Sequence, residues 1–482
     1  MEIDQVFFFK IVLSLIVLGL VWAYYFFGKR RLARWILIAA FVPSVFFSAW
    51  GFYNFDSPVD KTGYWDLYHY YLNAKYFEEL GYFNLYQASI ITDQEGENRF
   101  KKLDKIRDLK TQQHTGYFLE FHEYEKLKNN FSPERWEAFQ NDVDFFFQHL
   151  SPKVLTDRGY NATPPWNKTG SLIVNALPLE NPSTIPILIS LDCILFAGMV
   201  LLIFHAFGLL GVFLFLILWG LSPLVMSPLQ GGFLRLGWIA ALVASCGFFK
   251  LKQYTTSGAL LACATMLQVF PIVFLGGLVF QEIWNFCKTK KVSPRARKFL
   301  LGFLITAAVL FFYGSLDRSN NFDFSRWLEF FEKIVVHSQT SSNQRSGLAY
   351  LIPAEVAMLR PIFAILIVAW FAIVARRLSH DKLIPISFVL LPVFVAPASY
   401  YFSVIAIFAL AFADLSKRKN VICISLILLA FILQAFKTIQ ENAYHNSNTS
   451  YHWSALVFLF GLGILTIFSA RWKNKSGRLS SD

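Results

Sequence analysis

Charged residues are scarce in this sequence: Asp, Glu, Lys and Arg make up 16% of its 482 residues. Soluble domains average about 25%. The sequence instead contains many apolar runs of about 20 residues, the length of helix that crosses a hydrocarbon core of about 30 Å. Helices satisfy their own backbone hydrogen bonds inside lipid. The composition therefore excludes an ordinary soluble enzyme and predicts an all-α polytopic membrane protein.

Cysteine pairs and several catalytic motifs are also missing. The five cysteines lie in or at the ends of apolar runs and form no C-x-x-C pair, so the sequence suggests neither a disulfide framework nor a zinc site. No Walker A, G-x-G-x-x-G, H-E-x-x-H or G-x-S-x-G motif is present. Nucleotide binding, zinc proteolysis and α/β-hydrolase chemistry therefore have no support in the sequence.

The formal net charge of +12 would suit a nucleic-acid ligand, but its distribution indicates topology instead. The polar segment 52–182 is acidic, with 14 Lys and Arg residues against 19 Asp and Glu residues. The basic residues gather in short segments between apolar runs: 29–34, 250–252, 288–298, 376–382, 417–419 and 471–478. Such loops are typical of the cytoplasmic side of a membrane. We therefore expect no nucleic-acid partner, an N-terminus outside the cell and a C-terminus in the cytoplasm.

The apolar runs divide the chain into five parts. The predicted spans are 7–27, 34–51, 184–204, 208–226, 232–250, 256–268, 271–286, 298–315, 361–376, 383–398, 399–414, 420–437 and 453–471. Two of them are short and separated by Pro271, so we expect about 11–13 transmembrane helices. The expected parts are two helices in 1–51, an extracytoplasmic loop domain in 52–182, helices in 183–315, an extracytoplasmic loop with an amphipathic helix in 316–360, and helices with a basic cytoplasmic tail in 361–482.

A cluster of polar and aromatic side chains follows the second span, in WDLYHYYLNAKYFEELGYFNLYQ at 65–87. Residues 66–80 include no Gly or Pro and precede Gly81, a pattern that predicts one helix. A helix rich in Tyr and Trp can also lie in the headgroup region of a membrane. A helix that carries a functional site and a helix that lies in the headgroup region both fit a segment next to the bilayer.

Four residues of this helix are candidates for chemistry. Asp66, His69 and Tyr70 share one face with Asn73, and a carboxylate near a histidine is suited to general-base catalysis. Asp66 is equally well placed to cap the start of the helix. His69 is better explained as a hydrogen-bonded histidine at the membrane interface. Lys75 is either a snorkelling or a phosphate-facing cation.

Two further candidates lie close to the apolar spans. Arg235 follows two glycines at the start of a span, where its guanidinium matches the geometry of phosphate oxygens. A snorkelling role at the interface is the alternative. Asp192 lies inside a predicted span, which makes it either functional or a protonated acid bonded to a neighbouring helix.

The second polar segment, 316–360, contains an apolar stripe at helical spacing. The stripe predicts an amphipathic helix on the membrane surface and consists of Trp327, Phe330, Phe331, Ile334 and Val335. His337 and Arg345 follow it. Each of these two side chains is either a ligand-binding group or part of a solvated loop.

Four stretches together resemble the GT-C superfamily of membrane glycosyltransferases. They are similar to its bacterial branch of polyprenol-phosphate-mannose-dependent mannosyltransferases, and the resemblance extends over most of the chain. The first is the 65–87 stretch, with Asp-x-x-x-Tyr-Tyr followed by Ala-Lys-Tyr and Leu-Gly-Tyr-x-x-Leu-Tyr. The others are GYNATPPW (159–166), GGFLRLGW (231–238) and QVFPIVFL (268–275). The tyrosine of the second stretch lies one residue further from the prolines than in that branch, and Gln268 replaces a usual Lys or Arg.

The resemblance implies a GT-C-like bundle in a bacterial inner membrane. It implies transfer of a sugar from a polyprenyl-phosphate donor to a glycan or lipid acceptor, with inversion. Asp66 matches the catalytic base by position, and Asp56 and Asp60 are rivals for that role. Nothing in the sequence fixes a cofactor or a metal site, although a divalent metal is compatible with the resemblance.

The resemblance also extends to the remaining candidates. The loop 316–360 would close over the donor, so the expected phosphate-binding groups are Arg235, Lys75, His337 and Arg345. His69, Tyr70, Asn161 and Asp192 are further site candidates. Two other functions remain open: a lipid or glycolipid flippase, and a non-catalytic envelope scaffold. A transporter of this kind often has paired broken helices, of which the sequence shows one, near 268–271.

Overall fold

The computed structural model describes most of the chain. The described residues are 3–53, 63–99, 103, 105–116, 125–222, 232–339, 345–396, 398, 401, 404–444 and 449–469. The rival acids Asp56 and Asp60 lie outside them.

Seven helical runs in the described residues are long and apolar enough to cross a membrane. They are α1 (Ile3–Phe27), α2 (Arg31–Tyr53), α10 (Thr184–Leu221), η6 with α13 (Phe270–Leu275, Gly276–Thr289), α14 (Pro294–Gly314), α21 (Arg418–Tyr444) and α22 (Thr449–Ser469). Two shorter apolar helices accompany them, α11 (Gly237–Lys250) and α17 (Leu359–Ala375). The prediction of an all-α multi-pass membrane protein is confirmed at this level.

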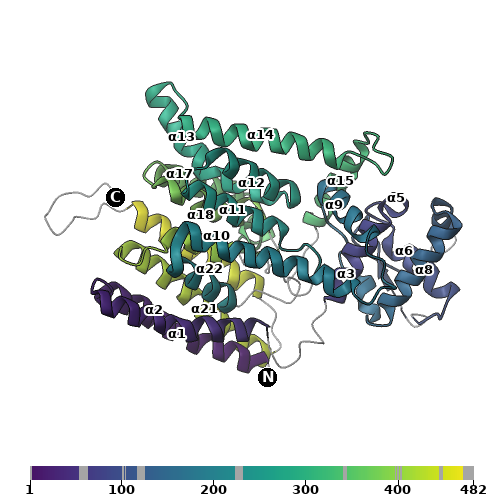
Figure 1. Ribbon diagram of the computed structural model, residues 1–482, viewed down its shortest axis with the longest axis horizontal. Coiled ribbons are helices and arrows are strands. Elements are labelled where there is room, and N and C mark those ends of the chain that lie inside the picture. Colours follow the sequence, from purple (N-terminus) through teal and green to yellow (C-terminus); the bar gives the residue numbers. More distant parts are fainter. Residues whose placement is uncertain are drawn as a thin grey trace.

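The membrane helices lie side by side, and a second body of short helices adjoins one end of them (Figure 1). We call this body the polar unit. It contains α3 (Tyr64–Leu67), η2 (Tyr68–Leu72), α4 (Asn73–Lys75), α5 (Phe77–Leu80), α6 (Leu85–Glu95), η3 (Glu125–Asn130), α8 (Pro133–Phe147), η4 (Pro152–Thr156), α9 (Pro164–Asn175), α15 (Ser325–Gln339) and an antiparallel pair, β1 (Lys105–Arg107) with β2 (His114–Gly116). In Figure 1, α1 begins at the end next to the polar unit, whereas α22 ends at the opposite end.

The tyrosines of the 65–87 stretch form the core of the polar unit instead of facing lipid headgroups. Tyr68, Tyr71, Tyr76, Tyr82 and Tyr86 are fully buried. Their hydroxyls find partners inside the unit: Tyr68 donates to Ser89 at 2.8 Å, and Tyr82 donates to the carbonyl of Ala162 at 3.0 Å. Buried tyrosines keep such partners because an unpaired hydroxyl is costly.

The predicted helix at 66–80 exists, but it is not uniform. It starts at Tyr64, widens into the π-helical turn η2, and is interrupted at Tyr76 before ending at Gly81. Gly81 has a φ of +55°, which a glycine adopts without a steric penalty. Asp66 is the third residue of the helix, and Gly63 occupies the N-cap position. The capping interpretation of Asp66 is therefore wrong.

The predicted spans agree with the observed elements in some places and differ in others. The predicted break between the spans 184–204 and 208–226 is confirmed in α10, which has a kink at Gly208, where φ is +74°. The break at Pro271 is confirmed, because α12 (Tyr254–Leu267) ends just before η6. The described residues of 383–398 and 399–414 form short helical turns instead of two long helices: α18 (Leu383–Ile386), η9 (Ser387–Leu390), α19 (Leu391–Phe394), α20 (Ile405–Ala409) and η11 (Leu410–Phe412). Pro385 and Pro392 lack the N–H that a continuous helix needs.

The second polar segment, 316–360, forms α15, α16 (Leu348–Leu351) and η7 (Ala354–Val356). Helix α15 is amphipathic. Its Trp327 and Phe330 side chains pack into the core of the polar unit, although two other apolar side chains of the helix, Leu328 and Val335, are exposed. The remaining short helix, η8 (His380–Lys382), follows α17.

Helices α12 and α14 approach closely because each has a glycine at the contact. A Cβ on Gly258 would lie 1.9 Å from the carbonyl oxygen of Phe299, and one on Gly302 would lie 2.1 Å from that of Thr255. Small residues allow this kind of backbone approach between membrane helices.

We expect Gly258→Ala to lower the thermal unfolding temperature of the purified protein in detergent. The methyl group would overlap backbone atoms, and relieving such an overlap costs about 1–3 kcal/mol. The matched control is Gly198→Ala in α10, where a Cβ would have no neighbour within 4 Å. Equal unfolding temperatures for the two variants would contradict the close packing of α12 on α14.

Candidate functional site

Asp66 and Arg235 face each other where the polar unit meets the membrane helices. The Nε of Arg235 lies 3.5 Å from Oδ2 of Asp66, and the two side chains are 8% and 14% exposed. The Arg235 guanidinium also lies over the ring of Tyr70, 4.2 Å from its centroid. A buried charge must be paired, and this cation meets both a carboxylate and an aromatic face. Asp66 and Tyr70, predicted on one helix face, form one group with Arg235, which was predicted separately.

Gly232 leaves room for this group. A Cβ at Gly232 would lie 2.6 Å from Cγ of Arg235 and 3.6 Å from Oδ2 of Asp66. A larger residue would displace the arginine side chain. The glycine therefore allows close packing of the arginine itself.

Asp192 holds the backbone from which Arg235 projects. Its carboxylate accepts hydrogen bonds from the backbone N–H of Arg235 at 3.1 Å and of Leu236 at 3.0 Å. These groups lie just before α11, where a carboxylate interacts favourably with the free N–H groups of the helix start. Asp192 is 4% exposed. The structure therefore favours a positioning role, with the acid bonded to a neighbouring helix.

The environment of Asp66 makes it a stronger base than an ordinary carboxylate. Burial raises its pKa to about 6, a shift that Arg235 opposes and Asp157 increases. Near neutral pH the group is still mostly ionised. A general base is most effective when its pKa lies close to the working pH.

His69 is held inside the polar unit by two hydrogen bonds. Its Nδ1 lies 2.7 Å from the carbonyl oxygen of Trp65, so this nitrogen must carry the proton. In the neutral ring Nε2 then accepts from the hydroxyl of Tyr86 at 2.7 Å, and Asp157 lies 3.8 Å away. Burial lowers the pKa of His69, which favours the neutral form. The hydrogen bonding predicted for His69 is confirmed, and its side chain is buried in the protein, at 2% exposed.

A histidine surrounded by four cationic side chains lies near these residues, and we call the five together the basic cluster. It consists of Arg107, Arg158, Lys333, His337 and Arg345. The pKa of His337 is lowered to about 3, first by burial and then by the four cations. Burial also lowers the pKa of Lys333 to about 7, and its Nζ donates to the carbonyl of Leu109 at 3.0 Å. The cluster would become more stable if it received an anion.

The basic cluster and the Asp66–Arg235 pair share one electrostatic environment. Asp157 shifts the pKa of Asp66 and also that of Lys333, while Arg235 and Lys333 both act on His69. The Nδ1 of His337 is buried and makes no hydrogen bond within the described residues. A donor or acceptor from a ligand would satisfy it.

Sequence reasoning missed Asp157, Arg107, Arg158 and Lys333. A signal existed for Lys333, because it lies four residues before His337 on one face of α15. The other three come from segments whose pairing depends on the tertiary fold.

All four stretches that carry the family resemblance meet around Arg235. Trp166 contacts Tyr70 with ring centroids 5.0 Å apart and Phe233 with centroids 5.5 Å apart. Thr163 donates to the carbonyl of Met266 at 2.6 Å, just before the fourth stretch. In that stretch, Gln268 donates to the hydroxyl of Tyr401 at 2.9 Å. Segments separated by up to two hundred residues thus converge on one place.

Two predicted site residues, Lys75 and Asn161, bond to groups other than Arg235: Lys75 pairs with a residue of α8, and Asn161 bonds within its own loop. Lys75 forms an ion pair with Asp142 at 2.7 Å, and the Asp142 side chain is 1% exposed. This contact places the ammonium group against α8, so the structure does not favour its predicted role beside Arg235. Asn161 donates to the carbonyl of Gly159 at 3.1 Å, while its Oδ1 is buried without a hydrogen bond.

No protein-family model, curated protein or solved structure matches this chain. Within the described residues, no three His, Cys, Asp or Glu side chains gather closely enough to hold a metal ion.

We expect Lys75→Met to destabilise the folded protein, because it leaves the Asp142 carboxylate buried without its counter-ion. Breaking such a pair costs about 3–5 kcal/mol. The double variant Lys75→Met/Asp142→Asn should recover part of this loss, because the amide is neutral and still accepts from Tyr76, whose hydroxyl lies 2.7 Å from Oδ2. Chemical unfolding of the three proteins in detergent measures the difference. A Lys75→Met variant as stable as the wild type would show that the lysine has no structural role.

Proposed function

We propose that this protein is an integral membrane glycosyltransferase with a GT-C-like bundle. It transfers a sugar from a polyprenyl-phosphate donor to an acceptor hydroxyl, with inversion. The observation that carries the proposal is the pairing of Asp66, whose pKa is raised to about 6, with Arg235 at the mouth of the membrane helices. An acid suited to proton abstraction thus lies beside a cation suited to a phosphate.

The reaction proceeds as a single displacement. The acceptor oxygen attacks the anomeric carbon, and its proton passes to the Asp66 carboxylate. The bond between the anomeric carbon and the phosphate oxygen breaks at the same time, and its electron pair leaves with the polyprenyl phosphate. Arg235 stabilises the charge on that oxygen through its guanidinium N–H groups. Because no covalent enzyme intermediate forms, the anomeric configuration inverts.

The basic cluster supports a phosphate-bearing donor. Four cations around a buried, neutral His337 repel one another, and an anion relieves that repulsion. Lys333, with a pKa of about 7, would then take up its full charge. His337 and Arg345 keep their predicted part in donor binding, and Lys333 and Arg158 join them. The convergence of the four stretches on Arg235 supports the same assignment.

Asp66→Asn should reduce transfer by about 10²–10⁴-fold, because an amide cannot accept the proton of the acceptor hydroxyl. The measurement is release of polyprenyl phosphate from a panel of short-chain polyprenyl-phosphate sugars by purified protein in nanodiscs. Glu137→Gln, which neutralises an exposed acid of α8, is the control and should retain wild-type activity. Retained transfer by Asp66→Asn would remove Asp66 from the mechanism.

The pH dependence of kcat/KM should report the titration of Asp66. The base acts only when ionised, so the rate should rise with pH up to about 6 and then level off. Arg235 lowers the pKa of Asp66, so Arg235→Gln should move this rising limb to higher pH while also reducing the rate. A wild-type limb near pH 4, the range of an unperturbed carboxyl group, would contradict the proposed environment of the base.

The broken segment between α17 and α21 favours transport as a second candidate function. Its short turns give the Pro271 break a counterpart, and transporter folds often contain such paired breaks. A flippase would move labelled polyprenyl-phosphate sugar across liposomes, and Asp66→Asn would move it equally well. Dependence of all activity on Asp66 would reject this candidate.

A further inference from the structure

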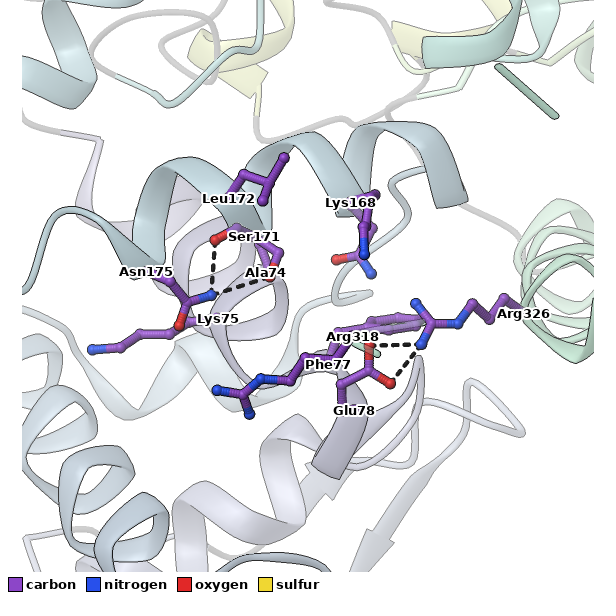
Figure 2. A pocket seen from close by; sticks show the side chains of 11 residues that line it. Ala74, Lys75, Phe77, Glu78, Lys168, Ser171, Leu172, Asn175, Arg318 and Arg326 are labelled. Atoms are coloured by element: carbon purple, nitrogen blue, oxygen red, sulfur yellow. Dashed lines mark hydrogen bonds and ion pairs between the residues drawn. The ribbon is translucent and has the colours of Figure 1, made fainter. Parts of the chain in front are cut away.

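A hollow of about 410 Å³ opens in the polar unit, apart from the residues assigned to catalysis (Figure 2). It lies between α4 and α5 on one side, α9 on another, and the segment from Arg318 to Arg326. Its lining consists of Ala74, Lys75, Phe77, Glu78, Asn167, Lys168, Ser171, Leu172, Asn175, Arg318 and Arg326. Neither Asp66, Arg235 nor any member of the basic cluster belongs to this lining. Its volume lies in the usual range of ligand pockets, about 300–1,000 Å³.

The lining carries four cations and one acid, and two of the cations are held by carboxylates. Lys75 pairs with Asp142, as described above. Arg326 reaches the Glu78 carboxylate at 2.6 Å, and Figure 2 shows this contact within the hollow. Lys75 and Arg326 therefore line the hollow, and their charges are balanced by carboxylates of the protein.

The other two cations have weak or uncharged partners. Lys168 donates to the carbonyl of Asp317 at 2.6 Å and to the amide oxygen of Asn320 at 3.4 Å, neither of which carries a charge. Arg318 is 62% exposed and lies 3.8 Å from the Glu79 carboxylate. That carboxylate already accepts from Arg135 at 2.7 Å. Lys168 and Arg318 therefore leave positive charge available at the hollow.

The remaining walls mix apolar and hydrogen-bonding groups. Phe77 and Leu172 offer apolar surface, and the Leu172 side chain is exposed. Ser171 and Asn175 bond to each other at 3.1 Å and present a hydroxyl and an amide. Sugar rings have apolar faces and hydroxyl edges, so they match both kinds of wall. A ligand without charge would leave Lys168 and Arg318 unused.

We propose that this hollow binds a negatively charged oligosaccharide, in which a phosphate or carboxylate lies between Lys168 and Arg318. Binding is independent of the proposed function. The further assignment, that this saccharide is the acceptor of the transfer reaction, rests on the proposed function. Ala74 at the hollow follows Asp66 by eight helical residues, about 12 Å along the axis. An acceptor anchored in the hollow therefore needs more than one sugar unit to present a hydroxyl to Asp66.

The test measures binding of maltotriose 1-phosphate to the full-length protein in phosphatidylcholine nanodiscs by calorimetry. Maltotriose and inorganic phosphate serve as comparison ligands. The test variant is Lys168→Gln/Arg318→Gln, and the control is Lys153→Gln, which removes an exposed lysine elsewhere in the polar unit. We expect the double variant to weaken binding of maltotriose 1-phosphate at least tenfold and the control to leave it unchanged. Both comparison ligands should bind more weakly than maltotriose 1-phosphate.

Three results would overturn the proposal. Equal affinity of the double variant and the wild type would place the ligand elsewhere. Inorganic phosphate binding as tightly as the phosphorylated trisaccharide would show an anion site without sugar recognition. Loss of binding in nanodiscs of phosphatidylglycerol would show that a lipid headgroup fills the hollow.

Arg235→Gln separates this proposal from the proposed function. The variant should lose sugar transfer and keep binding of maltotriose 1-phosphate. If the wild type transfers no sugar but the double variant still loses binding, the hollow is a saccharide site and the transferase proposal alone fails. If transfer occurs and the double variant binds normally, the hollow proposal alone fails.

Discussion

The ion pair of Arg235 with Asp66 is the interaction on which the rest of the site depends. Arg235 is almost buried between the membrane helices and the polar unit, and a buried guanidinium without a counter-charge would be strongly unfavourable. Three groups therefore converge on it: the Asp66 carboxylate, the Tyr70 ring and the loop backbone held by Asp192. The same pair couples the first helix of the polar unit to the start of α11, so that folding of the two bodies assembles the site.

Three polar regions of the protein differ in how their charge is balanced. Around Asp66 an acid and a cation are matched, and burial leaves the acid close to its titration point at neutral pH. In the basic cluster four cations lower the pKa of one histidine, and at the hollow Lys168 and Arg318 have uncharged or distant partners. A transferase needs this combination: a base, a site for the leaving phosphate and a separate site that orients the acceptor. The roles assigned to the three regions follow from that division.

Much of the fold followed from hydrophobic run length, and its irregular parts did not. The long apolar helices and the break at Pro271 were predictable because length and proline act locally. The turns at 383–412 were mistaken for spans because a buried, broken segment has the same composition as a membrane helix. The tyrosines at 65–87 looked interfacial, since the sequence does not show which aromatic residues will pack against each other.

For the candidate site, the sequence predicted Asp66, Tyr70, Arg235, Asp192 and His337 but not their contacts. It suggested phosphate binding for Lys75, whose partner Asp142 lies 67 residues away on another helix.

The most direct test of the central claim is the anomeric configuration of the transferred sugar. NMR of the product formed by the purified protein from a polyprenyl-phosphate sugar of known configuration gives the answer. Inversion is the predicted result, because the proposed mechanism uses Asp66 as the base of a single displacement. Retention would require a second displacement and would contradict the role given to Asp66.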